Sequence, residues 1–315
     1  MTKYLFDDNL RVEGRIDVGG GVTLYFQTDC GMYCEGSFSS NGFSDNGTVI
    51  KGVNGTSWRG MAISERASFR NSTIEGSGSG VVEVGGLTAE APAAIYTTAQ
   101  RGAISNVTFS SNTGYGVYYA DSTAACDIDV DNTVFLDQSL AAIRTTPQSV
   151  GEMLSDREDR ANEYNMPDGI PAILVQTVGF PTRTWPDLGD DNFYLIDAQM
   201  ITNRYVLGWR LMAGAHIKFK DGTYGGYQID LNNAALSFRV NGTADKPVIF
   251  DSESGTPGSW GGFYLGTKSN VWWEIEHLIV RNGGGFLIPG TSTLPDATEK
   301  ANNLSFAHAS PRVES

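Results

Sequence analysis

The feature that most constrains the fold of this chain is its repetition of short, strand-like runs. These runs are rich in β-branched and aromatic residues and end in Gly, Asn, Asp or Pro, as in Leu211–Phe219, Ala235–Gly242, Pro247–Phe250, Gly258–Leu265 and Ile275–Gly284. The pattern is typical of short β-strands separated by tight turns. Runs this short cannot each cover a hydrophobic core alone, so we expect them to stack on one another.

The repetition has a long period near 200 residues. Positions separated by this distance match in unbroken order, which predicts one complete unit followed by a truncated second copy. The matched pairs are Phe26 with Phe219, Val49-Ile50 with Val248-Ile249, Trp58 with Trp260, Thr73–Gly78 with Ile279–Gly284, and Val107–Phe109 with Leu304–Phe306.

A shorter period of 26 residues lies inside the first copy, where Asn106–Phe109 is followed by Asn132–Phe135. This period fits one turn of a solenoid, in which about three strands and three corners bury their inward side chains on the turn below. Asn71, Asn106 and Asn132 fall at equivalent corners, and Asn tolerates the left-handed backbone conformation that corners require. The predicted fold class is therefore all-β: a right-handed parallel β-helix forming a single continuous coil.

One segment interrupts the strand pattern. Val150, Met153 and Leu154 have helical spacing, which predicts a short helical or loop insertion near 148–165. The predicted organisation is β-helix unit 1 over 1–146, a helix and loop connection that continues the coil over 147–192, with a strand at Ala172–Val175, and β-helix unit 2 over 193–315.

Composition excludes some classes of function. The net charge of −14 and the absence of clustered Lys and Arg argue against a nucleic-acid partner. No run is long enough to span a membrane, and the first residues lack the apolar core of a signal peptide. The protein is therefore either cytosolic or has lost a signal sequence. Because the chain begins inside a strand pattern, we favour the second and expect an extracellular or cell-surface protein. Cys30, Cys34 and Cys126 are too few for a disulfide framework, although Cys30 and Cys34 could pair across a turn.

The second copy resembles the right-handed parallel β-helix proteins of bacterial surfaces, which are often exported lipoproteins. Its motifs are Tyr194–Ile196, Leu211–Phe219, Gly242–Phe250, Gly258–Phe263 and Ile279–Gly284. The first copy matches more faintly, since it has Lys51–Thr56 in place of the Gly-Thr-x-x-x-Pro element. The resemblance implies the fold and a bacterial surface setting, but it assigns no catalytic residue, because the shared residues form corners and stacks.

Enzymes with this fold often act on acidic polysaccharides, yet the sequence elements of polygalacturonases and pectate lyases are absent, and we predict no catalytic residue. Asp127, Asp129 and Asp131 alternate with apolar residues, which predicts three carboxylates about 7 Å apart on one outward face. They are candidate Ca²⁺ ligands, but we favour a solvated acidic face. Ca²⁺ takes six to eight oxygen ligands, and carboxylates along one strand are too widely spaced to meet one ion without help from adjacent turns.

The candidate carbohydrate-binding residues are Tyr264, Trp272, Glu274 and Glu276, where aromatic rings and carboxylates crowd together. The predicted function is a non-catalytic carbohydrate-binding, adhesive or structural module whose partner is a polysaccharide or cell-surface glycan. The alternative is a polysaccharide lyase or glycoside hydrolase acting on acidic polysaccharide. The sequence leaves the ligand and the oligomeric state open.

Overall fold

The structure is a computed structural model that describes residues 2–43, 45–84, 87–120, 126–176, 183–189, 191–198, 200–202, 208–223, 225–227, 237–261, 263–265, 272–283 and 312–313. These residues are predominantly β, and nearly all of their strand pairs are parallel. The all-β, parallel class predicted from sequence agrees with this arrangement. Helical structure in this part of the chain is limited to α1 (Pro147–Met153), η1 (Val53–Gly55) and η2 (Glu158–Arg160).

The chain divides into two compact units. The first comprises Met1–Thr145 and Glu152–Ile173, and the second comprises Thr146–Gly151 and Leu174–Ser315. The insertion predicted near 148–165 contains the end of α1, up to Met153, and the short 3-10 helix η2 (Glu158–Arg160), and its last residues form strand β18 (Glu163–Asn165). The strand predicted at Ala172–Val175 is β19 (Ile173–Val175).

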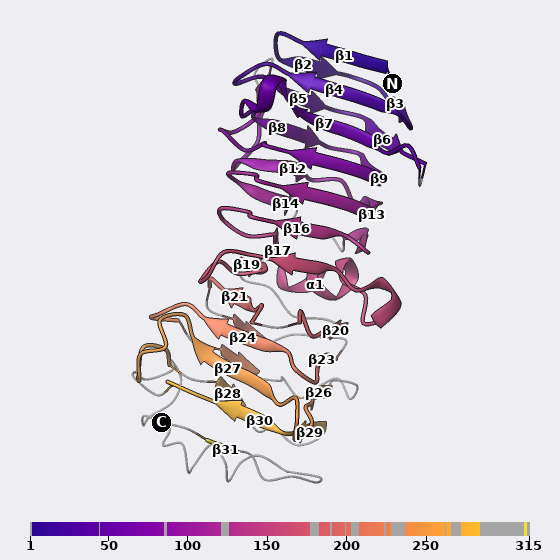
Figure 1. The fold of residues 1–315 in the computed structure, drawn as a ribbon. Coiled ribbons are helices and arrows are strands. Elements are labelled where there is room, and N and C mark those ends of the chain that lie inside the picture. The colour runs from indigo at the N-terminus through magenta and orange to yellow at the C-terminus, as the bar shows by residue number, and fades with distance from the viewer. Residues whose placement is uncertain are drawn as a thin grey trace. The chain divides into compact units, whose positions relative to one another are not determined.

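The strands of the first unit form three parallel rows, and the chain visits the rows in turn (Figure 1). Row one contains β3 (Ile16–Gly19), β6 (Ser37–Asn41), the first half of β9 (Arg66–Glu75), the first half of β13 (Arg101–Ser110) and β15 (Asp127–Asp131). Row two contains β1 (Thr2–Phe6), β4 (Val22–Phe26), β7 (Thr48–Gly52), the second halves of β9 and β13, β16 (Val134–Leu136) and β18. Row three contains β2 (Leu10–Val12), β5 (Gly31–Cys34), β8 (Gly60–Ile63), β12 (Ala93–Thr97), β14 (Tyr115–Tyr119) and β17 (Ile143–Thr145).

Asparagine makes the corner between rows one and two. Asn71, Asn106 and Asn132 have φ values of 47°, 54° and 48°, which lie in the left-handed region that Asn tolerates better than most residues. The Asn106 side-chain amide donates to Asn71 Oδ1, and Asn71 Nδ2 donates to the Gly42 carbonyl at 2.7 Å. The corner role predicted for these residues is therefore confirmed.

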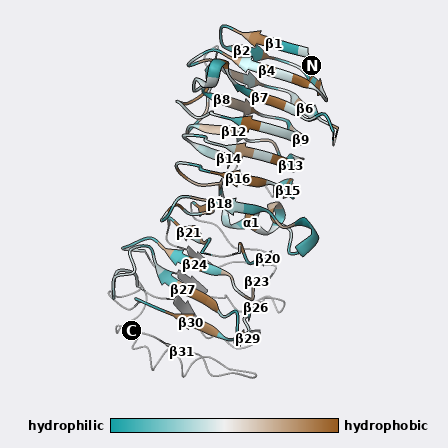
Figure 2. Ribbon diagram, viewed as in Figure 1, coloured by the Kyte–Doolittle hydropathy of each residue, from teal (hydrophilic) through white to brown (hydrophobic). Residues whose placement is uncertain are grey.

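The core of the first unit is built from columns of buried side chains that are register partners on successive strands. Hydrophobic and hydrophilic residues alternate along the strands of this unit (Figure 2). Phe109 and Phe135 are register partners, and their rings stack at 4.9 Å with an interplanar angle of 3°. Stacked aromatic pairs contribute roughly 0.5–1.5 kcal/mol beyond the burial of their area. The buried column in row two consists of Leu24, Ile50, Ile74, Phe109, Phe135 and Tyr164.

A second column inside the first unit is polar. The Ser77 amide and hydroxyl both donate to Asn112 Oδ1, at 2.9 and 2.7 Å, and Asn112 Nδ2 donates to Gln138 Oε1 at 3.0 Å. Gln138 Nε2 in turn donates to the Leu136 carbonyl at 2.7 Å. Ser77, Asn112 and Gln138 are fully buried, so these bonds satisfy groups that water cannot reach. We call this column the polar ladder.

The outer surface of row three packs against the segment from Ser79 to Glu90, which contains the antiparallel pair β10 (Glu83–Val84) and β11 (Leu87–Thr88). Val82 and Ala89 are buried, and the Tyr118 hydroxyl donates to Glu90 Oε2 at 2.9 Å. Row three is consequently buried on both faces at β8, β12 and β14, whereas rows one and two retain an outward face.

The second unit also contains three parallel sheets. The first contains β20 (Arg183–Trp185), β23 (Trp209–Met212), β26 (Ser237–Asn241) and β29 (Trp272–Glu276). The second contains β21 (Tyr194–Ile196), β24 (His216–Phe219), β27 (Val248–Ser252), β30 (Leu278–Val280) and β31 (Arg312–Val313). The third contains β22 (Met200–Thr202), β25 (Gly225–Tyr227) and β28 (Phe263–Leu265).

An aromatic pair and its hydrogen bond recur at positions that the 200-residue repeat matches with each other. Phe26 stacks on Trp58 at 4.5 Å, and Phe219 stacks on Trp260 at 4.3 Å. Each indole donates to a backbone carbonyl one turn further along the chain, from Trp58 to Glu75 at 2.9 Å and from Trp260 to Arg281 at 2.8 Å. The two units therefore share the geometry of this aromatic pair and of its hydrogen bond. The match of Phe109 with Phe306 lies outside the described residues.

Candidate functional site

The outward face of row one in the first unit carries charged side chains in regular register on three neighbouring strands. Phe69, Ile104, Ile128 and Val130 point inward and are fully buried. Side chains alternate between the two faces of a strand, so the residues between these apolar positions face solvent. We call the outward residues of β9, β13 and β15 the row-one face: Arg66, Ser68, Arg70, Arg101, Ala103, Ser105, Asp127, Asp129 and Asp131.

Two arginines lie side by side on the row-one face. Arg66 and Arg101 are register partners on β9 and β13, and both are exposed. Neighbouring strands lie about 4.8 Å apart, so two positive side chains start from adjacent backbone positions. Arg66 Nε donates to Ser68 Oγ at 3.3 Å. Neither arginine forms an ion pair within the described part of the chain.

The three predicted acids lie on β15, the next strand of row one. Asp127, Asp129 and Asp131 alternate with buried residues, as the sequence pattern predicted. Asp127 is the register partner of Arg101, and Asp131 Oδ2 is 3.7 Å from Arg160 Nη1. The carboxylates therefore lie beside guanidinium groups, which sequence reasoning did not anticipate.

This arrangement does not assemble a Ca²⁺ site from the predicted ligands. Among the described residues, no group of three or more His, Cys, Asp or Glu side chains could hold a metal ion. The register partners of Asp127, Asp129 and Asp131 on β13 are Arg101, Ala103 and Ser105. A cation, a methyl group and a hydroxyl supply few of the six to eight oxygens that Ca²⁺ takes. Calcium binding stays a prediction without a ligand shell to support it.

The predicted carbohydrate-binding residues lie on two strands of the second unit. The side chains of Tyr264 on β28 and Trp272 on β29 are outside the described residues. Glu274 is half-buried and lies 3.5 Å from Arg239 Nε on the neighbouring strand β26. Glu276 is also half-buried, and its backbone carbonyl accepts from the Gly242 amide at 3.0 Å. Sugar binding at these four residues therefore stays a prediction.

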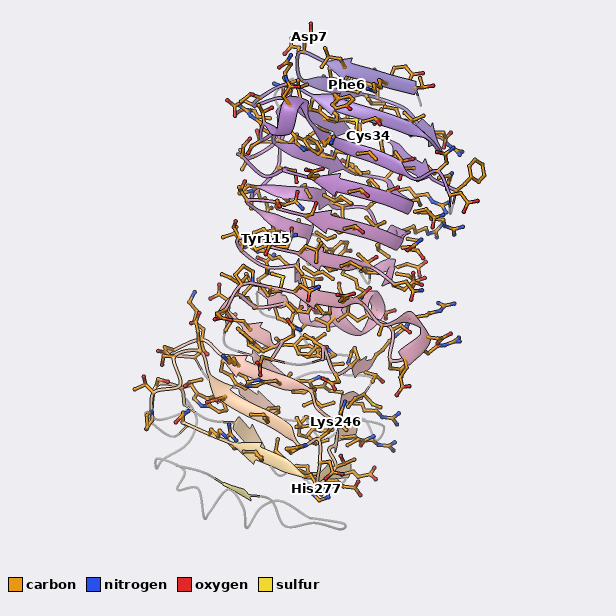
Figure 3. The ribbon with its side chains drawn as sticks, in the orientation of Figure 1. Phe6, Asp7, Cys34, Tyr115, Lys246 and His277 are labelled. Atoms are coloured by element: carbon orange, nitrogen blue, oxygen red, sulfur yellow. The ribbon has the colours of Figure 1, made fainter. Side chains whose placement is uncertain are left out.

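The thiols are buried and poorly suited to act as nucleophiles. All three cysteines are free, so the possible Cys30–Cys34 bridge is absent, because residues that bracket an extended strand are too far apart to join. Cys34 lies inside the first unit (Figure 3). Burial raises the pKa of Cys126 to about 12, which keeps this thiol protonated at neutral pH.

A second polar face lies on β24 and β27 of the second unit. His216 and Lys218 share one face of β24, and Lys218 is the register partner of Asp251. Lys218 Nζ lies 4.0 Å from the centre of the Phe193 ring. Burial, followed by the positive charge of Lys218, lowers the pKa of His216 to about 4. The imidazole is therefore neutral at physiological pH.

The remaining histidines do not join this face. His277 lies at the turn between β29 and β30 with φ of 47°, so it is a corner residue (Figure 3). His308 lies outside the described residues. The three histidines therefore supply no cluster in the part of the chain that the structure describes.

A signal for the arginines was present in the sequence. Arg66, Arg101 and Asp127 each precede a corner asparagine, namely Asn71, Asn106 and Asn132, by five residues. Aligning the turns at these asparagines brings all three charged residues into one column, although they are separated by 35 and 26 residues. The alternation of apolar residues within one strand contains no such information.

Comparison with known proteins adds no relative: no family model, curated protein or solved structure matches this chain. Within the described residues, no helix has the length and apolar character needed to cross a membrane. The functional assignment therefore depends on the row-one face and on the second polar face.

Proposed function

We propose that the chain forms a single right-handed parallel β-helix, displayed at a bacterial cell surface, that binds glycans without catalysis. The row-one face is the proposed binding surface. The three parallel rows of the first unit, the asparagine corners and the stacked columns support the β-helix. The acidic composition, which keeps a protein soluble in salt, and the family resemblance in the second copy support the surface setting.

The observation that carries the proposal is the mixture of hydrogen-bonding groups on an exposed row of strands. Guanidinium, hydroxyl and carboxylate side chains lie side by side in fixed register on β9, β13 and β15. A sugar offers hydroxyl groups that act as both donors and acceptors, so a face carrying both kinds of partner suits it. Rigid β-strands also hold these groups in place before the ligand arrives, which limits the entropy cost of binding.

The proposal is tested by screening the protein on a glycan array and assaying hits for turnover. We expect binding without release of unsaturated or shortened products. Ser68→Glu adds a carboxylate to the row-one face, whereas Thr73→Glu adds the same group to the outward face of row two on the same strand, β9. Binding should fall with Ser68→Glu and persist with Thr73→Glu. Equal loss in both variants, or no binding to any glycan, would refute the assignment.

A polysaccharide lyase or glycoside hydrolase acting on acidic polysaccharide is the second candidate. The second polar face favours it, because a neutral imidazole at His216 lies on the same face as Lys218 and next to the strand carrying Asp251. Such groups can transfer protons in general acid–base catalysis. Turnover of a uronate polymer that disappears in His216→Gln would establish this function in place of simple binding.

A further inference from the structure

The arginine pair on the row-one face lacks the acidic partners that the composition offers in excess. The chain contains 36 Asp and Glu residues against 22 Lys and Arg residues. Arg11, Arg15 and Arg157 all lie within ion-pair distance of a carboxylate. Arg66 and Arg101 have no such contact among the described residues, even though they lie next to each other.

Like charges directly opposite each other on neighbouring strands destabilise a sheet. The outer register partners of the two arginines differ in charge, so only one of them can offset this repulsion. Arg66 has the uncharged Ser37 as its register partner on β6, and Arg101 has Asp127 as its partner on β15. The order across the strands is therefore hydroxyl, guanidinium, guanidinium, carboxylate. An anion placed over the middle two positions would relieve the repulsion between them.

We propose that Arg66 and Arg101 form a subsite for an anionic group of the glycan, so that the ligand of the row-one face is an acidic polysaccharide. This inference rests on the glycan-binding function proposed above. Guanidinium binds carboxylate and sulfate through paired, charge-assisted hydrogen bonds, which are stronger than those between neutral groups. Uronic acids and sulfated sugars both supply such groups.

The same register decides which arginines can share one anionic group. Arg66 and Arg101 are neighbours across the strands, whereas Arg66 and Arg70 are four residues apart along β9. A residue rises about 3.3 Å in a strand, so Arg70 lies roughly 13 Å from Arg66, compared with about 4.8 Å between adjacent strands. One anionic group can therefore lie between Arg66 and Arg101, whereas Arg70 is too far from Arg66 to share it.

Hydroxyl recognition completes the subsite. Ser68 is the register partner of Ala103, and Ala103 is the register partner of Asp129, so a column with a small central residue runs beside the arginines. The small Ala103 side chain leaves room for a sugar ring at this position, between a serine hydroxyl and an exposed carboxylate. Asp129 can accept hydrogen bonds from sugar hydroxyl groups, because an ionised carboxylate acts only as an acceptor.

The net charge of −14 opposes the approach of a polyanion, but it does not cancel a local site. The screening length is about 8 Å at physiological ionic strength, so distant acids contribute little to the potential at Arg66 and Arg101. The contacts with the anionic group are themselves electrostatic and partly exposed. We therefore expect affinity to fall as salt is raised, but to persist at physiological ionic strength.

The test measures binding of a uronate polymer, the same polymer with its carboxyl groups reduced, and a sulfated polymer. Wild type should bind the uronate polymer and lose binding to the reduced one, and the sulfated polymer shows whether sulfate can replace carboxylate. The double variant Arg66→Gln and Arg101→Gln should weaken uronate binding by roughly 10- to 100-fold, from the loss of charge-assisted hydrogen bonds. Arg157→Gln removes a guanidinium of the same unit that pairs with Asp159, and it should bind as wild type does.

The outcomes separate this inference from the proposed function. Equal binding of the uronate polymer and its reduced form would overturn the anionic subsite while leaving glycan binding intact, as would an unchanged affinity in the double variant. Absence of binding to all three polymers and to the glycan array would overturn both proposals. Circular dichroism and thermal unfolding of the double variant confirm that any loss reflects binding, since both arginines are exposed and their replacement should leave the fold intact.

Discussion

Replacement of Asn112 by alanine tests whether the polar ladder holds the first unit together. Asn112 accepts two hydrogen bonds from Ser77 and donates one to Gln138, and all three residues are fully buried. Truncation leaves the Ser77 amide, the Ser77 hydroxyl and Gln138 Oε1 without their partner. Each buried group left unsatisfied costs about 1–3 kcal/mol, although a water molecule entering the vacated space would recover part of this cost. We therefore expect the free energy of unfolding to fall by roughly 3 kcal/mol.

Thr113→Ala is the matched control for this prediction. Thr113 is exposed, and its hydroxyl donates to the Ser77 carbonyl at 3.2 Å, so the control removes one hydrogen bond to the same buried residue. It should cost less than about 1 kcal/mol, because the Ser77 carbonyl keeps the hydrogen bond from the Thr113 amide at 2.8 Å. Both variants would be compared by denaturant-induced unfolding followed by circular dichroism.

Hydrogen exchange localises the effect of Asn112→Ala. The Ser77 amide donates to Asn112 Oδ1, so a peptide containing Ser77 should exchange faster in this variant, whereas peptides from the second unit should not change. If Asn112→Ala costs no more than Thr113→Ala, or if the Ser77 amide keeps its protection, the ladder does not stabilise the fold as argued.

Two further predictions concern pH and aromatic stacking. The pKa of His216 is lowered to about 4 by burial and by Lys218, and Asp251, Arg281 and Asp191 are the other charged groups that act on it. In the unfolded state His216 takes up a proton near pH 6.5, whereas in the folded state it stays neutral until about pH 4. The free energy of unfolding should therefore fall by up to about 3 kcal/mol between pH 6.5 and 4. Denaturant titrations at each pH measure this dependence, and His216→Gln should remove the contribution of His216 to it. A slope identical in wild type and variant would contradict the burial argument. Phe109→Ala should destabilise the first unit by about 3–5 kcal/mol in the same titration, because it opens a cavity in the stacked column, whereas Phe43→Ala, at a side chain that is 71% exposed, should change stability little. Similar losses in both phenylalanine variants would count against the column.

The features that the sequence predicted correctly are local or strictly periodic. The corner asparagines were recognised because positive φ is a property of one residue and its neighbours. The stacking of Phe109 on Phe135 followed from a 26-residue period with a strand of similar composition at each step. The alternation of exposed and buried residues in β15 likewise follows from the two-residue repeat of any strand.

The features that the sequence did not predict depend on which strands become neighbours. The spacing between equivalent residues changes from turn to turn: Ser77 and Asn112 are 35 residues apart, whereas Asn112 and Gln138 are 26 apart. A fixed period therefore places Asn112 correctly against only one of its partners. The segment that covers row three, between Ser79 and Glu90, is part of the longer turn, and no pattern in it specifies which surface it meets.

The sequence by itself therefore determined that the chain forms short strands, where its corners lie, and which side of each strand is apolar, because these properties depend on residues close together along the backbone. Only the tertiary structure decided which outward side chains lie side by side. Loops of unequal length set the register between turns, and that register brings Arg66 next to Arg101, and Arg101 next to Asp127. The proposed binding surface is a product of this register.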